Sequence, residues 1–171
     1  ATINPSELDL LEETVIKINR TAKVTSRGKR FRFSALVAIG DGKGHVGVGL
    51  GKANEVIACI QKGKEIAKRN MFKVPLVNGT IPHKIIGKHG ASRAMLKPAA
   101  PGTGIIAGGA IRSVCEVLGI QDVVAKSLGS ANPHNVLKAC VNGLKSQNSP
   151  KILSAIRGKK ISEVISKREA N

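Results

Sequence analysis

The segment 23–52 constrains the fold of this chain more than any other part of the sequence. It contains two turn signals in succession, the basic sequence RGKR at 27–30 and the glycine-rich sequence GDGKG at 40–44. Residues 31–39 between the turns begin with alternating apolar and polar side chains and continue with apolar ones, which predicts a strand. We therefore expect a stiff β-ribbon with a cationic tip, an arrangement suited to contacts with phosphate groups.

This segment belongs to a first module, predicted to be β-β-β-α over residues 15–72. Its strands are expected at 15–24, 31–39 and 45–50. The odd-numbered residues of the second strand should share one face, opposite Arg32 and Ser34. Gly47 and Gly49 would leave one face of the third strand bare and permit close backbone approach.

A helix should complete the first module, with Asn54 as its cap and Glu55 in its first turn. Its expected core positions follow helical spacing: Val56, Ile57, Ile60, Ala67 and Met71. Residues 1–14 precede the module as an acidic extension. Within it, residues 6–14 are predicted to begin a short helix with Ser6 as a candidate cap.

Residues 73–146 are predicted to form a second module with the element order β-β-β-α-β-α, which makes the chain an α+β protein. The chain enters it through 72–76 and an Asn78-Gly79 hairpin signal. Further strands are expected at 81–86, 92–96 and 122–126, and helices at 110–118 and from Asn132-Pro133 onward. Gly119 should end the first of these helices. Residues 147–171 form a basic tail with room for a short helix that need not pack on the body.

The distribution of charge indicates the class of partner. The formal net charge is +17, and residues 15–171 contain 28 basic and seven acidic side chains. A compact body this basic repels itself unless a polyanion neutralises it, which favours nucleic acid. A membrane surface is the weaker alternative, because no amphipathic helix pairs a basic face with bulky anchors. With aromatics at only 2%, affinity should come from backbone contacts and shape rather than from base stacking.

Few residues suggest chemistry of their own. Cys59, Cys115 and Cys140 form no CxxC pair, so we expect buried, reduced thiols in a cytosolic protein. The histidines lack metal-ligand spacing, and the scattered carboxylates offer no acid cluster for a metal-dependent nuclease. We expect no catalytic residue, no metal and no cofactor. No apolar run reaches transmembrane length, and no transit peptide precedes residue 15, which favours a bacterial over an organellar origin.

Two glycine-rich motifs raise the alternative of a nucleotide-binding enzyme. Residues 42–47 match GxGxxG but lie between two predicted strands, where a hairpin turn is favoured over a dinucleotide site. Residues 102–107 match GxGxxA before a helix, and Asp122 stands at the spacing of a ribose-binding acid. Free N–H groups there could hold a phosphate. A nucleic-acid phosphate is favoured over a mononucleotide or dinucleotide, and a simple packing turn is the remaining alternative.

The chain resembles the bacterial-type small-subunit ribosomal protein S-five family over nearly all of residues 12–146. Three long segments carry the resemblance: RGKRFRFSALVAIGDGKGHVGVGLGKANEV (27–56), KVPLVNGTIPHKIIGKHGASRAMLKPAAPGTGIIAGGAIRSV (73–114) and DVVAKSLGSANPHNVLKA (122–139). It implies an N-terminal module like a double-stranded-RNA-binding domain, followed by a two-layer α/β module with a left-handed crossover. That fold analogy removes the dinucleotide alternative.

The resemblance further implies a structural role in translation rather than an enzymatic one. Family members bind small-subunit ribosomal RNA, hold the head of the subunit relative to its body, support assembly and accuracy, and help line the mRNA entry channel. Their neighbours are ribosomal proteins S-four and S-eight, with S-three near the mRNA entry. We expect a cytoplasmic ribosomal protein with no membrane contact and no homo-oligomer. A double-stranded-RNA binder outside the ribosome is the remaining alternative.

The expected RNA contacts are mostly basic residues on turns and strand faces. The first ribbon and its surroundings should supply Lys23, Arg27, Gly28, Lys29, Arg30, Arg32, Lys43 and Lys52. A second patch is expected from Lys84, Lys88, His89, Arg93, Lys97, Arg112 and Lys126. The family's spectinomycin-proximal loop corresponds to Val24, Thr25, Ser26, Arg27, Gly28, Lys29 and Arg30. The family often has Gly-Gly at the basic turn, where this chain has Arg27-Gly28, which should leave the turn less free.

Overall fold

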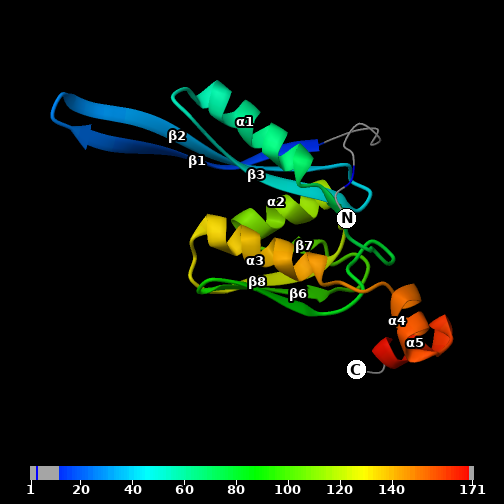
Figure 1. Ribbon diagram of the computed structural model, residues 1–171. Coiled ribbons are helices and arrows are strands. Elements are labelled where there is room, and N and C mark those ends of the chain that lie inside the picture. Colours follow the sequence, from blue (N-terminus) through cyan, green and yellow to red (C-terminus); the bar gives the residue numbers. More distant parts are fainter. Residues whose placement is uncertain (1–2, 4–11, 170–171) are drawn as a thin grey trace.

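The computed structural model describes residue 3 and residues 12–169, which form two sheets, three packed helices and a helical tail (Figure 1). The first part contains β1 (Glu12–Thr25), β2 (Gly28–Gly40), β3 (His45–Ala53), α1 (Val56–Arg69) and β4 (Phe72–Lys73). The second part contains β5 (Ile85–His89), β6 (Ser92–Pro98), β7 (Ile105–Ile106), α2 (Gly109–Leu118), β8 (Val123–Gly129) and α3 (Pro133–Lys145). The tail consists of α4 (Pro150–Arg157) and α5 (Ile161–Glu169). The predicted α+β class is confirmed.

The first sheet is antiparallel, in the order β1-β2-β3-β4. Its three long strands confirm the strands predicted at these places, and each extends beyond the predicted range. The helix predicted at 6–14 is wrong for residues 12–14, because these residues pair with the end of β2. Residues 6–11 of that prediction lie outside the described part of the chain.

β1 and β2 form a ribbon whose outer half projects from the body (Figure 1). The turn at its tip is tighter than predicted, because Thr25 pairs with Gly28 and only Ser26 and Arg27 lie between the strands. Gly28 has a φ angle of 115°, a conformation that favours glycine. Residues 29 and 30 therefore belong to a strand, where pairing fixes the direction of their side chains.

Helix α1 lies on one face of the first sheet, and its backbone closely approaches that of β3. A Cβ atom added at Gly49 would lie 2.3 Å from the carbonyl oxygen of Gly63. Because the two backbones approach so closely, the buried face of the helix consists of the small residues Cys59, Gly63 and Ala67. The prediction of Ile57 as a core position is wrong, since this side chain is 82% exposed. The bare face predicted for β3 is confirmed.

The second sheet has the order β5-β6-β8-β7. Helices α2 and α3 cover one of its faces, and Figure 1 shows the other face open. β7 runs parallel to β8 across α2, a pairing that the sequence did not predict. The Asn78-Gly79 signal makes a tight turn with φ angles of 51° and 75°, but only one bridge, between Val77 and Thr80, accompanies it. The strand predicted at 81–86 starts only at residue 85.

The helix ends follow most of the predictions. Asn132 caps α3 by accepting a hydrogen bond from the N–H of His134. Gly119 ends α2 in the left-handed conformation. Helix α1 differs, because Glu55 rather than Asn54 stands at its N-cap and no side chain caps it.

The two parts share one hydrophobic core. The face of the first sheet opposite α1 packs on α2 and α3, so that four layers alternate as α1, first sheet, α2 with α3, and second sheet (Figure 1). Leu36 and Val46 of the first sheet join Leu118 and Leu137 of the helices in this core. This shared core accounts for the apolar run within β2, since both faces of the strand are buried there.

Backbone hydrogen bonds also join the two parts. The turn at 41–44, between β2 and β3, lies against the end of α2. The N–H of Gly42 donates to the carbonyl of Val117, and the N–H of Gly44 donates to that of Leu118, both at 3.0 Å. A Cβ atom at Gly119 would lie 1.9 Å from the carbonyl oxygen of Gly42. Gly42 and Gly44 of the GxGxxG match therefore belong to a hairpin turn that contacts a neighbouring helix.

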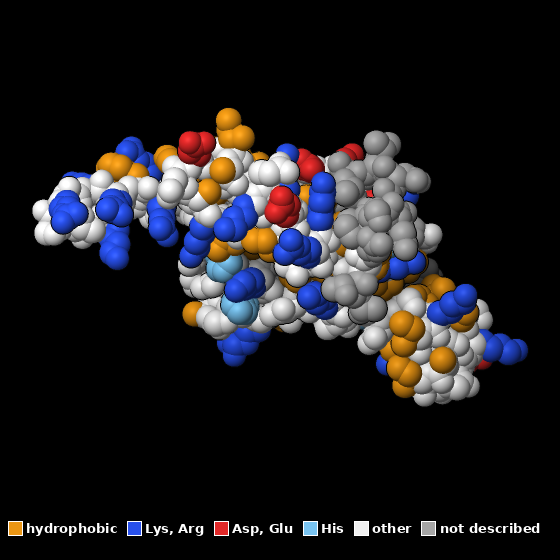
Figure 2. Space-filling view, turned by 45° about the horizontal axis from the view of Figure 1, so that its top comes forward, with side chains coloured by type: hydrophobic (Ala, Val, Ile, Leu, Met, Phe, Trp, Pro, Cys, Tyr) orange, Lys and Arg blue, Asp and Glu red, His pale blue; other side chains and the backbone are white. Residues whose placement is uncertain are grey.

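The tail packs differently from the body. None of the described residues of α4 is buried, and Ile152, Ile156, Ile161 and Ile165 are exposed on the two helices. Figure 2 shows hydrophobic side chains gathered on this part of the surface. The tail is more helical than predicted, with two short helices that contact each other.

Candidate nucleic-acid interface

The strand pairing gives the ribbon two different faces. Lys23 stands opposite Arg30, and Thr21 stands opposite Arg32. Residues paired in this way point to the same side of a sheet, and alternation along each strand brings all four to one face. These residues line a shallow hollow of about 280 Å³ on the ribbon. We call Thr21, Lys23, Arg30 and Arg32 the cationic face.

The opposite face of the ribbon is mainly apolar. Ala22, Val24 and Phe31 lie on it, and Val24 is 73% exposed. The guanidinium carbon of Arg20 lies 3.8 Å from the centre of the Phe31 ring, a cation–π contact. Lys29 pairs with Val24 and so points away from the cationic face, on the side opposite Arg30.

Four other predicted residues lie on the strands and turns of the first sheet. Arg27 and Gly28 form the exposed tip of the ribbon. Lys43 is exposed in the turn that contacts α2, whereas Lys52 lies near the far end of β3. The structure therefore brings Lys52 close to the base of the ribbon and keeps Lys43 away from it.

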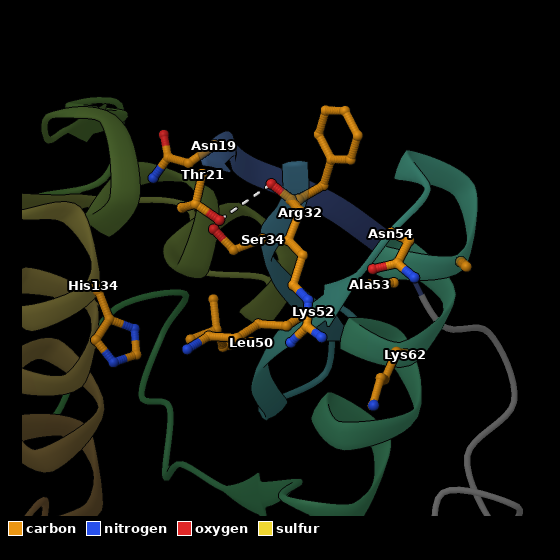
Figure 3. A pocket seen from close by; sticks show the side chains of 12 residues that line it. Asn19, Thr21, Arg32, Ser34, Leu50, Lys52, Ala53, Asn54, Lys62 and His134 are labelled. Carbon is orange, nitrogen blue, oxygen red and sulfur yellow. Dashed lines mark hydrogen bonds between the residues drawn. The ribbon is translucent and has the colours of Figure 1, made fainter. Parts of the chain in front are cut away.

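At its base, the cationic face continues into a groove of about 830 Å³ between the first sheet, the start of α1 and the start of α3 (Figure 3). Three cationic side chains, Arg32, Lys52 and Lys62, line this groove. Its uncharged polar side chains are Asn19, Thr21, Ser34 and Asn54. Arg32 belongs both to the groove and to the cationic face, so the two surfaces are continuous.

His134 is the groove residue supplied by α3, and Figure 3 shows it across from Leu50 and Lys52. Among the described residues, its buried ring nitrogen Nδ1 has no hydrogen-bond partner. Burial lowers the pKa of His134, and the neighbouring charges of Lys138, His89 and Lys52 lower it further. The ring is therefore neutral at pH 7, because the nearby cations oppose its protonation.

Four of the seven residues predicted for the second patch lie together on the open face of the second sheet. Lys88 stands opposite Arg93, and the alternation of the strands places Lys97 and Lys126 on the same side. All four side chains are exposed. Apolar Ile86, which is 58% exposed, lies on this face as well.

The other three predicted residues lie elsewhere. His89 faces the helices and is close enough to His134 to affect its pKa. Arg112 lies on α2, where its Nε donates to Oε1 of Glu116 at 2.9 Å. Lys84 is exposed just before β5. The predicted patch is thus divided between two sides of the second sheet.

The GxGxxA loop has a structural role that involves its presumed acid. Oδ1 of Asp122 accepts a hydrogen bond of 2.9 Å from the N–H of Gly104, and the N–H of Val123 donates to the carbonyl of the same glycine. Asp122 is buried, so its carboxylate does not project toward a ribose. These bonds give the loop a structural role and make its acid unavailable to a ribose, whereas contact of the loop with a nucleic-acid phosphate stays a prediction.

Several groove residues were not predicted. Asn19, Thr21 and Ser34 could have been placed beside Arg32 from the sequence, had a two-residue turn at the ribbon tip been assumed. The position of Lys62 on α1 could have been predicted from the helical spacing. His134 carries no local signal, because its place in the groove depends on how α3 packs against the first sheet.

The wider surface agrees with a polyanionic partner. Figure 2 shows Lys and Arg side chains spaced along the projecting ribbon and over the adjoining body. The described cysteines are buried and unpaired, as predicted. Among the described residues, no helix is both long enough and apolar enough to span a membrane.

Comparisons with known proteins agree with these features. The family description "Ribosomal protein S5, N-terminal domain" matches residues 11–75, and "Ribosomal protein S5, C-terminal domain" matches residues 87–157. The small ribosomal subunit protein uS5 of Syntrophobacter fumaroxidans is 50% identical over 162 residues, covering 95% of this chain and 97% of that protein. The protein of the same name from Lawsonia intracellularis is 54% identical over 154 residues, covering 90% and 94%. The one from Bordetella petrii is 50% identical over 157 residues, covering 92% and 91%.

These matches extend through both sheets, the ribbon and the helices that line the groove. The family consists of structural, non-enzymatic ribosomal proteins. At this level of identity and coverage, the chain belongs to the ribosomal protein S5 family.

Proposed function

We propose that this chain is a structural component of the small ribosomal subunit and that it binds small-subunit ribosomal RNA. The observation that carries the proposal is the continuous basic surface formed by the cationic face and the groove. Lys23, Arg30 and Arg32 lie on one side of the paired ribbon, and Lys52 and Lys62 extend the same surface onto the body. Guanidinium groups form bidentate contacts with phosphates, and such contacts fix orientation without specifying sequence.

The expected affinity depends on the number of phosphates neutralised. If this surface and the open face of the second sheet together engage about eight phosphates, log K should fall with log salt with a slope of roughly −6 to −7. A slope near zero would contradict the proposal. The high net charge of +17 supports many such contacts.

In this proposal the protein works as a clamp. RNA on the ribbon and RNA on the open face of the second sheet would be held in a fixed relative orientation, because the two sheets share one core. The same clamp would stabilise the head of the subunit relative to its body and support assembly, decoding accuracy and the mRNA entry channel. Its protein neighbours would be S-four and S-eight, with S-three near the entry, and residues 24–30 would lie near the spectinomycin site. Residues 15–72 and 73–146 would be the two domains.

Sedimentation of a cell lysate through a sucrose gradient at high salt tests this proposal. The chain should be found by mass spectrometry in the small-subunit peak, in a one-to-one ratio with other small-subunit proteins. Its presence only at the top of the gradient would contradict the proposal and favour a free RNA binder. As a control for specificity, the chain should be absent from the large-subunit peak.

A further inference from the structure

We propose that the groove between the ribbon and α3 holds a single unpaired nucleotide of the bound RNA, with its base against the uncharged polar side chains and its phosphate against the cations. This inference rests on the proposed function and names a site for one nucleotide within it. The residues that carry it are Asn19, Ser34 and His134 for the base, with Arg32 and Lys52 for the phosphate.

The size and shape of the groove favour a compact ligand. Its volume of about 830 Å³ lies within the range of roughly 300–1,000 Å³ found for small-molecule sites. The hollow on the cationic face, at about 280 Å³, has about a third of that volume. The ribbon therefore suits a backbone that passes over it, whereas the groove has room for a base.

The polar side chains of the groove carry both donors and acceptors. Asn19 stands directly opposite Ser34 in the strand pairing, and Asn54 lies at the start of α1 on the other side. A phosphate offers only acceptors, so it could not donate a hydrogen bond to the amide oxygens. A base edge offers donors and acceptors together, and unpaired bases are recognised in RNA through such edges. The composition of the wall thus fits a base better than a second phosphate.

His134 adds an unsatisfied group at the same place. Its buried Nδ1 has no partner among the described residues, although buried polar atoms are nearly always hydrogen-bonded. Figure 3 shows the ring beside the groove, across from Leu50. Because Nδ1 is shielded from solvent, a base could bond to it only after the ring turns toward the groove. Without that turn, the half-buried ring offers its exposed edge for packing against a base.

The cations provide a route for the strand that enters the groove. Arg32 continues the row formed by Lys23 and Arg30, and Lys52 lies next along the groove. Consecutive phosphates could follow this row from the ribbon, and the base of the last nucleotide would then turn into the groove.

The test compares two RNA probes on the full-length chain: a random-sequence single-stranded hexaribonucleotide and an RNA duplex of about 16 base pairs. Ser34→Leu would fill the groove without removing a charge. It should weaken hexamer binding about ten-fold, the effect of losing one well-held base, and leave duplex binding within about two-fold. Ser127→Leu, at an exposed serine of β8, is the matched control and should change neither affinity.

A second variant keeps the test independent of folding at Ser34. Asn19→Leu changes an exposed residue on the same wall and should also weaken hexamer binding, with an unchanged circular dichroism spectrum. If both variants bind the hexamer as tightly as the unmodified chain does, the groove holds no base and the inference is overturned, while duplex binding and co-sedimentation still support the proposed function. If the unmodified chain binds neither probe and does not sediment with small subunits, the proposed function fails as well.

Discussion

Oδ2 of Asp41 lies 2.6 Å from the ring nitrogen Nδ1 of His45, across the turn that joins β2 to β3. The other carboxylate oxygen of Asp41 accepts hydrogen bonds from the N–H groups of Lys43 and His45, at 2.8 and 3.0 Å. One side chain thus organises the whole turn that contacts α2. Burial opposes ionisation of Asp41, but these hydrogen bonds and the charge of His45 outweigh it and lower the pKa of Asp41 below 3.8.

Asp41→Ala should reduce the free energy of unfolding by about 1–3 kcal/mol near neutral pH, since it leaves two N–H groups without their acceptor. The pKa of Asp41 is lower in the folded chain, so its contribution is complete above about pH 4 and is lost as the pH falls through the folded value. Urea unfolding at about pH 7 and pH 2.5 measures both effects. Asp41→Asn, which keeps an acceptor, should cost less; equal midpoints for Asp41→Ala and the unmodified chain would contradict the prediction.

Two glycines that end helices should respond differently to alanine. Gly119 and Gly158 both have positive φ angles, 85° and 61°, but only Gly119 approaches another backbone, at Gly42. Gly158→Ala should therefore cost about 1 kcal/mol, from the left-handed conformation alone. Gly119→Ala should cost about 3 kcal/mol or more, because the end of α2 must also move away from the turn. Chemical denaturation of both variants tests this prediction. Equal losses in the free energy of unfolding would show that the close approach to Gly42 adds no cost.

The cationic face should matter for RNA binding and little for folding. Lys23→Ala and Arg30→Ala should each reduce the slope of log K against log salt by about 0.7–0.9, because each removes one phosphate contact. The free energy of unfolding should stay within about 0.5 kcal/mol, since both residues are exposed on the ribbon. Filter binding of ribosomal RNA fragments over a salt series measures the slope.

Arg112→Ala provides the contrast for these ribbon variants, because Arg112 is paired with Glu116 on α2. Its effect on the salt slope should be clearly smaller. Loss of the folded circular dichroism spectrum in Arg30→Ala would mean that Arg30 is structural and would overturn the assignment of the cationic face.

The three thiols should resist alkylation in the folded chain. Burial raises the pKa of Cys115 to about 12, with a smaller effect from the charge of Glu116, and burial also raises the pKa of Cys140. Cys59 is buried too, and its Sγ donates to the carbonyl of Gly51 at 3.1 Å. Iodoacetamide at about pH 8 should therefore label no cysteine in buffer and all three in urea, as read by intact-mass spectrometry. Rapid labelling of Cys115 or Cys140 in buffer would show that the shared core opens.

His134 should titrate below the ordinary value of 6.5 in the RNA-free chain. Because the unfolded chain binds a proton more readily at this residue, its contribution to stability falls as the pH drops below about 6.5. Lys52→Ala should raise the pKa of His134, and Lys159→Ala, in the tail, should leave it unchanged. Ring proton shifts followed by NMR give the value directly; an identical pKa in all three chains would exclude the influence of Lys52.

Much of this fold could be predicted from local patterns. The alternation in 31–39 predicts the face on which Arg32 lies. The glycines of β3 predict a close backbone approach, which the structure shows with α1. The same glycines also explain the error at Ile57, because a helix that touches a bare strand turns its small residues inward and its large ones outward. The spacing of apolar residues predicts the helix, but it does not predict which side of the helix faces the sheet.

Features that depend on long-range packing could not be predicted. The pairing of β7 with β8 involves only two residues of β7 and leaves almost no pattern in the sequence. The groove combines ribbon residues with His134, more than a hundred positions away along the chain, and its existence depends on α3 packing beneath the first sheet. The charge of the ribbon could be predicted, whereas the polar wall beside it required the strand register.

The contact between the turn at 41–44 and the end of α2 gives the molecule a fixed internal angle. Two backbone hydrogen bonds and a shared core oppose rotation of the sheets against each other, because rotation would break these bonds and open the core. The distance between a ligand on the ribbon and a ligand on the open face of the second sheet is then set by the protein and not by the ligands. Ligands bound at these two places would therefore keep the same separation in every copy of the protein.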